Sequence, residues 1–355
     1  MAESLNPTQP APQPRARQRP SLGDISTLYV AVLLRAAAAE GANADALATQ
    51  FRVDERALVS PEARISIPRF MRLGHAAIAE TGNPALGLRS GALTRPVDAG
   101  IAGLAAETAA TAGQALSTLI RFSLLTSQNS RGLPSVNPGQ RVARFYSIQP
   151  YNEYNRFVVD SVLAGWTQML RTVTGRFDVL ERVTMEYSSI GLDEVFERWF
   201  RCPVEFGSPE NTLVIRESIW QHPCQMAQPA MHEHLVRWCE QALERLQKGW
   251  RTSDRVRHLI TPMLRGQTPT LETIASRLGT TPWTLQRHLN EEGTCFRDLL
   301  DDTRRSLAAD YLSETGSSLS EIAWLLGFAN PPAFHKAFQR WYGMSPGEFR
   351  KQPIS

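Results

Sequence analysis

Residues 271–289 read LETIASRLGTTPWTLQRHL, and residues 319–338 read LSEIAWLLGFANPPAFHKAF. The pattern Ile-Ala-x-x-Leu-Gly begins at Ile274 in the first stretch and recurs 48 positions later at Ile322. An apolar pair spaced by four residues follows each copy, which indicates one unit written twice with one residue added at the turn. Two short amphipathic helices joined at a glycine predict a helix-turn-helix in each copy.

The predicted helices of this repeat begin with side chains that can cap them. Thr270 precedes the first helix, and Ser318 with Glu321 forms a capping box, in which a hydroxyl and a carboxylate each accept a bond from a free backbone N–H. The second helix of each copy begins with a capping oxygen and a proline, whose missing N–H costs nothing at the first helical position. These starts are Thr281-Pro282 and Asn330-Pro331, and Ser345-Pro346 begins a last short helix in the same way.

The apolar spacing assigns an inner and an outer face to each second helix. Leu285 and Leu289 in the first copy, and Phe334 and Phe338 in the second, are expected to pack inward. Gln and Arg suit contacts with base edges, and Lys or Arg suits contacts with phosphates, although any single helix taken alone could simply be solvated. The outward residues are Trp283, Thr284, Gln286, Arg287, Pro332, His335, Lys336, Gln339 and Arg340.

One helix from Cys295 to Ser313 is expected between the two copies. Its buried stripe comprises Leu299, Leu300, Leu307, Tyr311 and Leu312. At about 1.5 Å per residue this helix is on the order of 28 Å long. That length is close to the roughly 34 Å between successive major-groove entries on one face of DNA. One chain is therefore expected to place two reading helices in adjacent turns of the duplex.

Residues 254–351 resemble the DNA-binding domain of the AraC/XylS family of bacterial transcription regulators. The matching motifs are Ile274-Ala275, Leu278-Gly279, Trp283-x-Leu-Gln286-Arg287, Ile322-Ala323, Leu326-Gly327-Phe328, Phe334, Phe338 and Arg340-Trp-Tyr-Gly343-Met-Ser345-Pro346-x-x-Phe349-Arg350. The resemblance implies that the DNA-facing positions are Trp283, Gln286, Arg287, Pro331, Pro332, His335 and Lys336. Because two prolines stand where the family commonly has polar residues, we expect the first copy to read bases and the second to clamp the backbone.

The amino-terminal part has a different pattern. Residues 1–21 are rich in Pro, Gln and Ala and are expected to form a disordered tail. Apolar residues at helical spacing predict helices from Asp24 onward, from Pro68, over 113–127 and over 155–173, while Gly100–Leu104 reads as a turn-rich passage. Alternating or β-branched runs predict strands at 142–148, 179–187 and 212–215. The expected fold is an α+β domain over residues 22–220, followed by the all-α double helix-turn-helix domain.

Residues 24–220 resemble the arabinose-binding-type amino-terminal domain of regulators of the ornithine-utilisation type. The matching motifs are Asn83-Pro-Ala-Leu-Gly87-Leu-Arg-Ser-Gly91, Gly100-x-x-Gly103-x-Ala-Ala, Ala115-Leu, Val195-Phe-x-x-Trp-Phe, Cys202-Pro-Val204-x-Phe206 and Asn211-x-Leu. The resemblance implies a domain that senses a small molecule and contributes to dimerisation. Aromatic walls with a few polar groups would suit such a pocket, or would simply pack in the core. The candidate effector-binding residues are Arg121, Tyr151, Tyr154, Trp166 and Tyr187.

A helical linker is expected over residues 221–252. Its long helix, residues 229–248, fits a domain linker or a dimer contact equally well, and periodicity does not separate the two. His232-x-His234 would place two imidazoles on different helix faces, so we expect a solvated surface and no metal or cofactor. The four cysteines include no C-x-x-C pair and are expected to be reduced structural thiols.

Other sequence features bound the function. No run of 18 apolar residues exists to cross a bilayer, and the formal net charge of +3 is only mildly basic. No G-x-S-x-G elbow, phosphate loop or G-x-G-x-x-G signature occurs, so an enzyme is not expected. A repair enzyme with a zinc-held cysteine acceptor is one alternative, but it needs four clustered cysteines near the amino terminus and the first here is Cys202. An architectural DNA-binding protein with no effector is the other.

The sequence therefore predicts a ligand-responsive transcription regulator, an activator, with three parts after the tail. The expected effector-binding and dimerisation domain spans residues 22–220, and the DNA-binding domain spans residues 253–351. A helical linker, residues 221–252, is expected to join the two. The expected partners are double-stranded promoter DNA, RNA polymerase, a second copy of the chain, and an amino acid or other small metabolite, with no membrane contact. The expected location is the cytoplasm, at the nucleoid.

Overall fold

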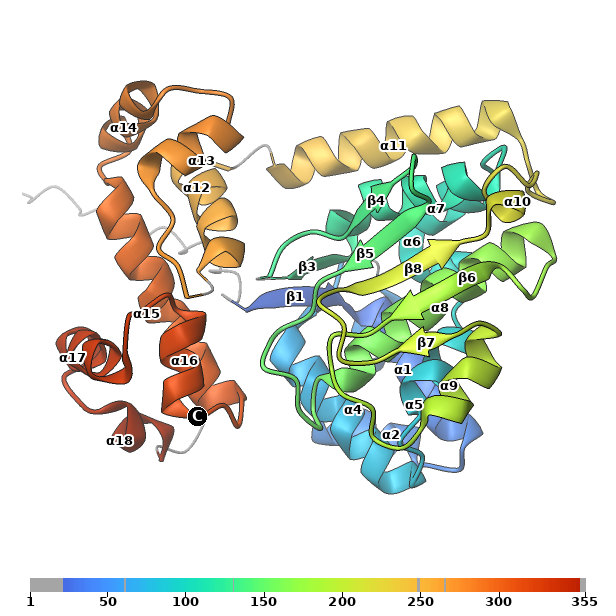
Figure 1. Ribbon diagram of the computed structural model, residues 1–355, viewed down its shortest axis with the longest axis horizontal. Helices are drawn as coiled ribbons and strands as arrows, with labels where there is room; N and C mark the ends of the chain where they lie inside the picture. Colours follow the sequence, from blue (N-terminus) through green and yellow to red (C-terminus); the bar gives the residue numbers. More distant parts are fainter. Residues whose placement is uncertain (1–21, 61, 130, 248–249, 265, 352–355) are drawn as a thin grey trace, which may run out of the picture.

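The computed structural model describes residues 22–60, 62–129, 131–247, 250–264 and 266–351. The predicted tail, residues 1–21, lies outside this set. An α+β body extends to residue 247, and a helical body begins at residue 252, so the predicted fold class is confirmed (Figure 1). Among the described residues, no helix is long and apolar enough to cross a membrane.

A five-stranded sheet forms one layer of the α+β body. Its strand order is β4-β5-β8-β6-β7, and neighbours are antiparallel except β6 and β7. The strands are β4 (Ser135–Asn137), β5 (Val142–Phe145), β6 (Leu180–Thr184), β7 (Val204–Glu205) and β8 (Asn211–Ile215). The three strands expected from the sequence are thus present as β5, β6 and β8. Leu213 of β8 lies opposite Ala143 on one side and Val183 on the other, and all three side chains are buried.

A second, three-stranded sheet has the antiparallel order β2-β1-β3. Its strands are β1 (Gly23–Ser26), β2 (Arg64–Ser66) and β3 (Ser127–Asn129). The helix expected from Asp24 onward begins only at Thr27, where Ser26 caps it. The helix expected over 113–127 was too long, because α7 (Ala112–Arg121) is followed by a 3-10 turn, η2 (Ser123–Leu125), and by β3, which pairs with β1.

Helix α8 (Arg156–Thr174) confirms the helix predicted over 155–173 and packs between the sheet and α5 (Leu86–Ala92). Close approach of α5 requires glycine, since a Cβ at Gly91 would lie 2.2 Å from the Cβ of Ala164. Gly100–Leu104 was wrongly expected to be turn-rich and lies in α6 (Gly100–Glu107), where Gly103 lets the helix pass the carbonyl of Pro96. The remaining elements of this body are α1 (Thr27–Ala39), α2 (Ala44–Gln50), α3 (Glu55–Val59), α4 (Ile67–Thr81), η1 (Pro96–Ala99), α9 (Asp193–Phe200) and α10 (Glu217–Trp220).

Helix α11 (Pro229–Gln247) packs along the α+β body, across α6 and η2 (Figure 1). Leu235 and Cys239 are buried in a cluster that also contains Phe122. Beside this packed face lie two partly exposed large apolar side chains, Met231 at 48% and Trp238 at 52% exposure. The helix is therefore fixed to the α+β body and leaves an apolar surface along the edge of its packed face.

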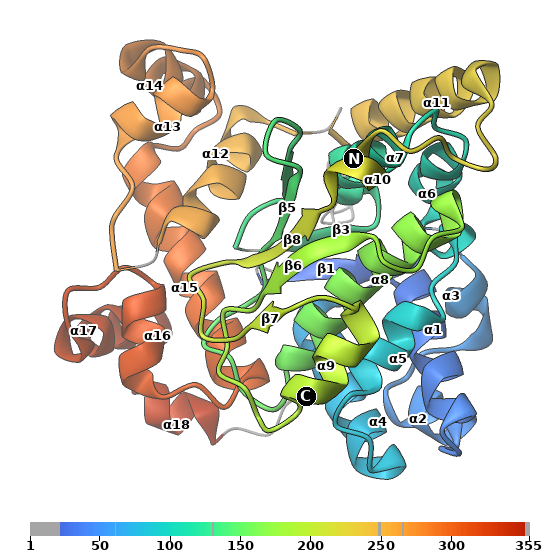
Figure 2. The same cartoon turned by 45° about the vertical axis from the view of Figure 1, so that its right-hand side comes forward.

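The helical body consists of α12 (Thr252–Ile260), η3 (Thr261–Met263), α13 (Leu271–Arg277), α14 (Pro282–Glu291), α15 (Phe296–Glu314), α16 (Leu319–Leu325), α17 (Pro331–Tyr342) and α18 (Pro346–Arg350). It meets the α+β body beside the three-stranded sheet, where the Nε2 of Gln128 in β3 lies 3.3 Å from the Nδ1 of His258 in α12. Figures 1 and 2 agree that α14 and α17 lie on the side of the helical body that faces away from the α+β body.

Candidate DNA interface and effector pocket

The two helix-turn-helix units have the caps expected from the sequence. Thr281 Oγ1 accepts a bond from the N–H of Thr284 at 3.2 Å, and Asn330 Oδ1 accepts from the N–H of Ala333 at 2.9 Å. Ser318 and Glu321 form a reciprocal capping box, and Ser345 forms another with its third helical residue. The starts of α14 and α17 are therefore fixed by local chemistry, which sets the direction of both outer faces.

The inner faces are also as expected. Leu285 and Leu289 of α14 are buried, as are Phe334 and Phe338 of α17. The connecting helix α15 has 19 residues, so its length is about 28 Å. All five residues of its predicted buried stripe are buried, namely Leu299, Leu300, Leu307, Tyr311 and Leu312.

On α14, Trp283 and Arg287 project into solvent, and the Trp283 side chain is 73% exposed. The guanidinium carbon of Arg287 lies 5.5 Å from the centre of the Trp283 ring, and its Nε is 3.9 Å from a Glu291 oxygen. Gln286 is half-buried and donates to Asn290 Oδ1 at 2.8 Å, while Thr284 is half-buried near the cap. These contacts hold the side chains near the outer face without removing their ability to bind a base edge.

On α17, Pro332, His335 and Lys336 are exposed and Pro331 is half-buried. Arg340 differs from them, because its Nη2 donates to both carboxylate oxygens of Asp301 in α15, at 2.8 and 2.9 Å. Asp301 also accepts from the indole N–H of Trp341. Arg340 therefore braces α17 against α15, a role that sequence spacing did not predict.

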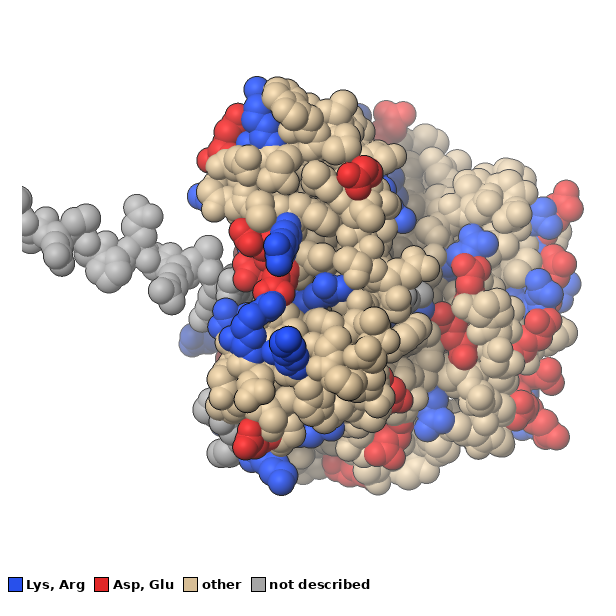
Figure 3. Space-filling model, turned by 60° about the vertical axis from the view of Figure 1, so that its left-hand side comes forward, with Lys and Arg blue, Asp and Glu red and all other residues tan. Residues whose placement is uncertain are grey.

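The outer surface of the helical body is unevenly charged. In Figure 3, Lys and Arg side chains gather at the top of this body, at the height of α14, and again near its middle, beside a group of acidic side chains. Arg287 on α14 and Lys336 on α17 belong to the two separate reading helices.

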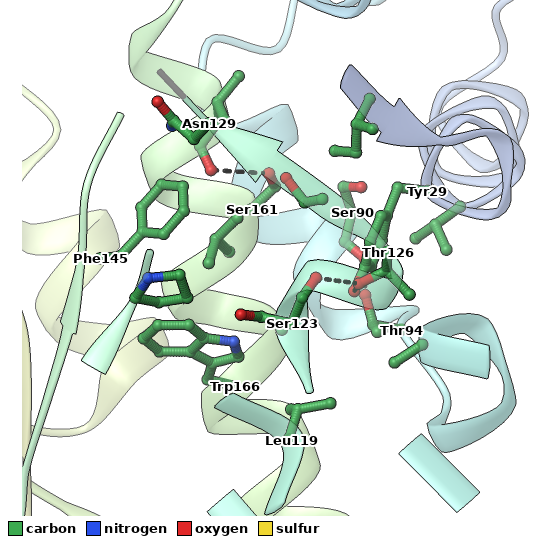
Figure 4. Close-up of a pocket in the computed structure, with 18 of the residues that line it drawn as sticks. Tyr29, Ser90, Thr94, Leu119, Ser123, Thr126, Asn129, Phe145, Ser161 and Trp166 are labelled. Carbon is green, nitrogen blue, oxygen red and sulfur yellow. Dashed lines mark hydrogen bonds between the residues drawn. The ribbon is translucent and has the colours of Figure 1, made fainter. Parts of the chain in front are cut away.

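A cavity of about 100 Å³, partly open to solvent, lies inside the α+β body. Its wall includes residues from α1, β3, η2, β5 and α8. Figure 4 shows Phe145 and Trp166 on one side, with Tyr29, Ser90, Thr94 and Thr126 on the other. A mostly apolar cavity with a few polar groups has the composition of a small-molecule site.

The five predicted effector residues are not brought together. Trp166 lines the cavity, packed edge-on against Phe145 with ring centres 6.0 Å apart. Arg121 makes a surface ion pair with Glu240 of α11 at 2.7 Å. Tyr154 stacks on His75 at the junction with the helical body. Tyr151 and Tyr187 belong to two buried polar clusters, described next.

Arg131 is the centre of the first cluster. Its guanidinium makes a two-point bond to the Glu186 carboxylate at 2.8 and 2.9 Å, and both side chains are about 93–94% buried. The same carboxylate accepts from the Tyr151 hydroxyl and from Asn211 Nδ2. Burial opposes the charge of Arg131, but the bonds from Glu186 outweigh it and hold the pKa of Arg131 above its usual value. The cluster fastens the loop after β3 to the five-stranded sheet.

The second cluster is the pair Asp160 and Tyr187. The Tyr187 hydroxyl donates to Asp160 Oδ1, and burial raises the pKa of the Asp160 carboxyl from 3.8 to about 7. The unfolded carboxyl loses its proton near its ordinary pKa, whereas the folded one keeps it until about pH 7. Because the folded state then binds more protons, stability is expected to fall as pH rises from about 4 to about 7 and to level off above.

Asp160→Asn is expected to flatten this pH dependence, because the amide keeps an oxygen for the Tyr187 hydroxyl and cannot ionise. Urea unfolding of wild type and variant at about pH 5 and about pH 8 measures the effect. The variant should gain stability relative to wild type at the higher pH. An identical pH dependence in both proteins would show that Asp160 is ionised at neutral pH in the folded state.

Histidines and cysteines have structural positions. His232 is buried, so the solvated surface expected there was wrong: its Nδ1 lies 2.8 Å from the carbonyl oxygen of Ala105. The His234 ring is tilted by 45° against the Trp238 ring. Burial raises the pKa of Cys202, Cys224 and Cys239 to about 11, so these thiols stay protonated. Within the described residues, no group of three or more His, Cys, Asp or Glu side chains could hold a metal ion.

Strand β3 joins the cavity to the helical body. Ser127 and Asn129 line the cavity, while Gln128 between them contacts His258 of α12. Neighbouring side chains along a strand point to opposite faces, so this one three-residue strand contacts both the cavity and α12 of the helical body. The sequence did not reveal this strand, nor the hydroxyl-bearing cavity residues, because they form no local motif and come from distant segments.

The double helix-turn-helix with an attached α+β body defines a DNA-binding regulator, and comparison with known proteins gives its family. Residues 41–224 match the arabinose-binding domain of AraC transcription regulators, and residues 274–352 match a helix-turn-helix domain. The ornithine utilization regulator of Pseudomonas aeruginosa is 30% identical over 331 residues, which are 93% of this chain and 97% of that protein. The chain therefore belongs to the AraC family of transcription regulators.

Two further similarities are more limited. The urease operon transcriptional activator of Escherichia coli is 44% identical over 82 residues, which are 23% of this chain and 28% of that protein. The crystal structure of the regulator CdpR from Pseudomonas aeruginosa has 21% identity and a TM-score of 0.41, covering 87% of this chain and 96% of that one. As the sequence resemblances predicted, the protein is a DNA-binding transcription regulator with an AraC-type amino-terminal domain.

Proposed function

We propose that this protein is an effector-dependent transcription activator that reads bases with α14 in one major groove and clamps the DNA backbone with α17 in the next. One observation carries the proposal: two capped helices present exposed outer faces on the same side of the helical body, separated by a rigid helix of about 28 Å. The length of α15 is close to the roughly 34 Å rise of one turn of DNA.

The proposed DNA contacts follow from side-chain chemistry and exposure. Arg287 hydrogen-bonds to a guanine edge and Gln286 to an adenine edge, and Trp283 packs beside them. His335 and Lys336 take the backbone of the second groove. The full proposed set is Trp283, Thr284, Gln286, Arg287, Pro331, Pro332, His335, Lys336 and Arg340, of which Arg340 acts by positioning α17 through Asp301.

The cavity of the α+β body holds the effector, a small metabolite, and β3 transmits its presence. A ligand against Ser127 or Asn129 shifts the preferred position of Gln128, and with it the contact to His258. Such a ligand changes DNA binding only if its affinity differs between two arrangements of the bodies. The proposed functional division is residues 22–220 for sensing and dimerisation, 221–252 for the linker and 253–351 for DNA binding.

A homodimer completes the proposal, with the exposed apolar surface of α11 as the contact. Met231 and Trp238 supply exposed apolar area beside the packed face of this helix. The dimer works in the cytoplasm at the nucleoid and recruits RNA polymerase. The name of the urease operon transcriptional activator, 44% identical over 82 residues, supports activation.

Trp238→Glu is expected to leave the protein monomeric, because it places a charge in the exposed apolar surface of α11. Light scattering on size-exclusion fractions measures the mass of each protein. Glu233→Gln, on the same helix in a 3.8 Å surface pair with Arg237, is the matched control and should remain dimeric. A dimer of unchanged stability in Trp238→Glu would place the contact elsewhere.

Genome-wide occupancy and transcript measurements test the function itself. Wild type, a deletion strain and the double substitution Gln286→Ala with Arg287→Ala form the three arms. Wild-type occupancy is expected at a small set of promoters whose transcripts fall in the deletion strain, and the double substitution should lose those sites. Occupancy of the same promoters by the double variant, or unchanged transcripts in the deletion strain, would contradict the proposal.

A further inference from the structure

The cavity of the α+β body has no ionic partner for a ligand. None of the described residues that line it is Asp, Glu, Lys, Arg or His. A charged group that moves into such a site loses its hydration and finds no group of opposite charge. The free energy lost is far larger than the free energy gained from one hydrogen bond. A free amino acid would bring two charges into this space.

Two charged groups that act on the cavity residue Tyr29 are each held in ion pairs. Arg64 and Asp98 are the two that act on the Tyr29 hydroxyl electrostatically. Arg64 Nη1 lies 2.5 Å from the Asp24 carboxylate, and Asp98 lies 2.6 Å from Arg35 Nη2. Asp98 also bonds Arg95 at 3.1 Å, so Arg64 and Asp98 are both already engaged with groups of opposite charge.

The two sides of the cavity differ in chemistry. Phe145 and Trp166 form an aromatic wall, and Met169 and Leu119 extend its apolar surface. Hydroxyl groups gather on the opposite wall (Figure 4). A ligand that fits both walls has an apolar body and a polar group at one end.

The hydrogen bonds of the hydroxyl wall decide which polar group fits. Thr94 donates to the carbonyl of Ser90 at 3.1 Å, and Thr126 donates to the carbonyl of Ser123 at 3.2 Å. With these protons used, each oxygen can still accept a bond, although Thr126 Oγ1 also lies 3.4 Å from the Tyr29 hydroxyl. Burial raises the pKa of the Tyr29 hydroxyl, so this group also stays uncharged.

From these observations we infer that the cavity takes an uncharged ligand with an apolar, ring-sized body and a hydroxyl or N–H group that donates to the Thr94 and Thr126 oxygens. The inference rests on the proposed effector role of this cavity and narrows the expected ligand from small metabolites in general to neutral ones. Amino acids and simple carboxylates are excluded, because the site holds no partner for their charges.

N-phenyl-1-naphthylamine and its sulfonated analogue 8-anilino-1-naphthalenesulfonate test this directly. They share one skeleton and one N–H donor and differ by a single negative charge, and both report binding by fluorescence. The full-length protein is expected to bind the neutral probe saturably and the sulfonate at least about tenfold more weakly at the same site, since the anion stays uncompensated.

Cavity-filling variants define that site. A Cβ at Gly165 would lie 3.6 Å from Thr94, ordinary contact, so Gly165→Leu adds its side chain at the hydroxyl wall without an initial clash. Val162→Phe fills the same cavity from the preceding turn of α8, for the case in which the glycine variant melts early. Val195→Leu, on the exposed surface of α9, is the control. Loss of neutral-probe affinity by about tenfold or more in a folded filler, but not in the control, supports the assignment.

Three results would overturn the inference: equal or tighter binding of the sulfonate at the filler-sensitive site, neutral-probe binding that the fillers leave unchanged, or no saturable binding of the neutral probe. The experiment contains no DNA. Failure of promoter recognition would therefore leave the ligand class standing, while tight sulfonate binding would overturn the ligand class and leave the regulator in place.

Discussion

Glu186→Gln is expected to lower the free energy of unfolding by about 3–5 kcal/mol, because it leaves the buried guanidinium of Arg131 without a counter-charge. Four groups depend on that carboxylate: Arg131, Tyr151, Asn211 and, through Arg131, the loop that follows β3. The amide side chain keeps the volume and part of the hydrogen bonding, so the loss reports charge and not a cavity. Urea or thermal unfolding of the full chain measures it.

The control is a surface pair in the same sheet. Arg182 and Glu205 lie 3.4 Å apart with both side chains 51% exposed, so Glu205→Gln is expected to cost about 0–1 kcal/mol. If both substitutions lower the free energy of unfolding by the same amount, the Arg131–Glu186 pair is solvated and not buried as the structure shows. Because the cluster anchors the loop after β3, we also expect Glu186→Gln to weaken the response of DNA binding to the effector.

Replacing Gln286 and Arg287 together by alanine is expected to cost about 2–6 kcal/mol on the cognate promoter site, as each two-point contact with a base edge contributes about 1–3 kcal/mol. Both side chains lie on α14 and neither is part of its buried face, so the fold should be unaffected. Specific binding should fall much more than binding to unrelated DNA. Competition titrations with cognate and scrambled duplexes measure the ratio.

Lys336→Ala on α17 is the comparison for that result. Lys336 is exposed and is proposed to contact phosphate. Its loss should therefore weaken binding to all DNA sequences alike and reduce the slope of log affinity against log salt concentration by about 1. Equal affinity of the α14 double variant and wild type for the cognate site would remove the base-reading role of α14. A sequence-dependent effect of Lys336→Ala would instead give α17 a base-reading role.

The helical body could be predicted almost entirely from its sequence because its signals are local. Capping residues at Thr281, Ser318 and Asn330 and the apolar spacing of α14 and α17 fix helix starts and faces within a few residues of chain. The bracing of Arg340 by Asp301 was missed, since the two residues are 39 positions apart and nothing in either segment marks the contact.

The α+β body was less predictable because its organisation is non-local. Strand β1 pairs with β2 and β3, which are distant in sequence and only three residues long, so no alternation could reveal them. Gly103 looked like a turn residue, but it serves the packing of a helix against a carbonyl. Of the aromatic effector candidates, only Trp166 lines the cavity; the chemistry that distinguishes the cavity comes from serine and threonine hydroxyls, which are common everywhere in a sequence.

We propose that one chain of this protein reads two successive major grooves with two unequal helices. A hydroxyl-radical footprint of the full protein on an occupied promoter tests it most directly. For each chain, two protected patches about one helical turn apart are expected on the same face of the duplex. The α14 double variant should lose sequence preference in one patch only, and Lys336→Ala should weaken protection in the other. A single protected patch per chain would contradict the account. So would the loss of both patches together when the α14 double variant is present at a saturating concentration.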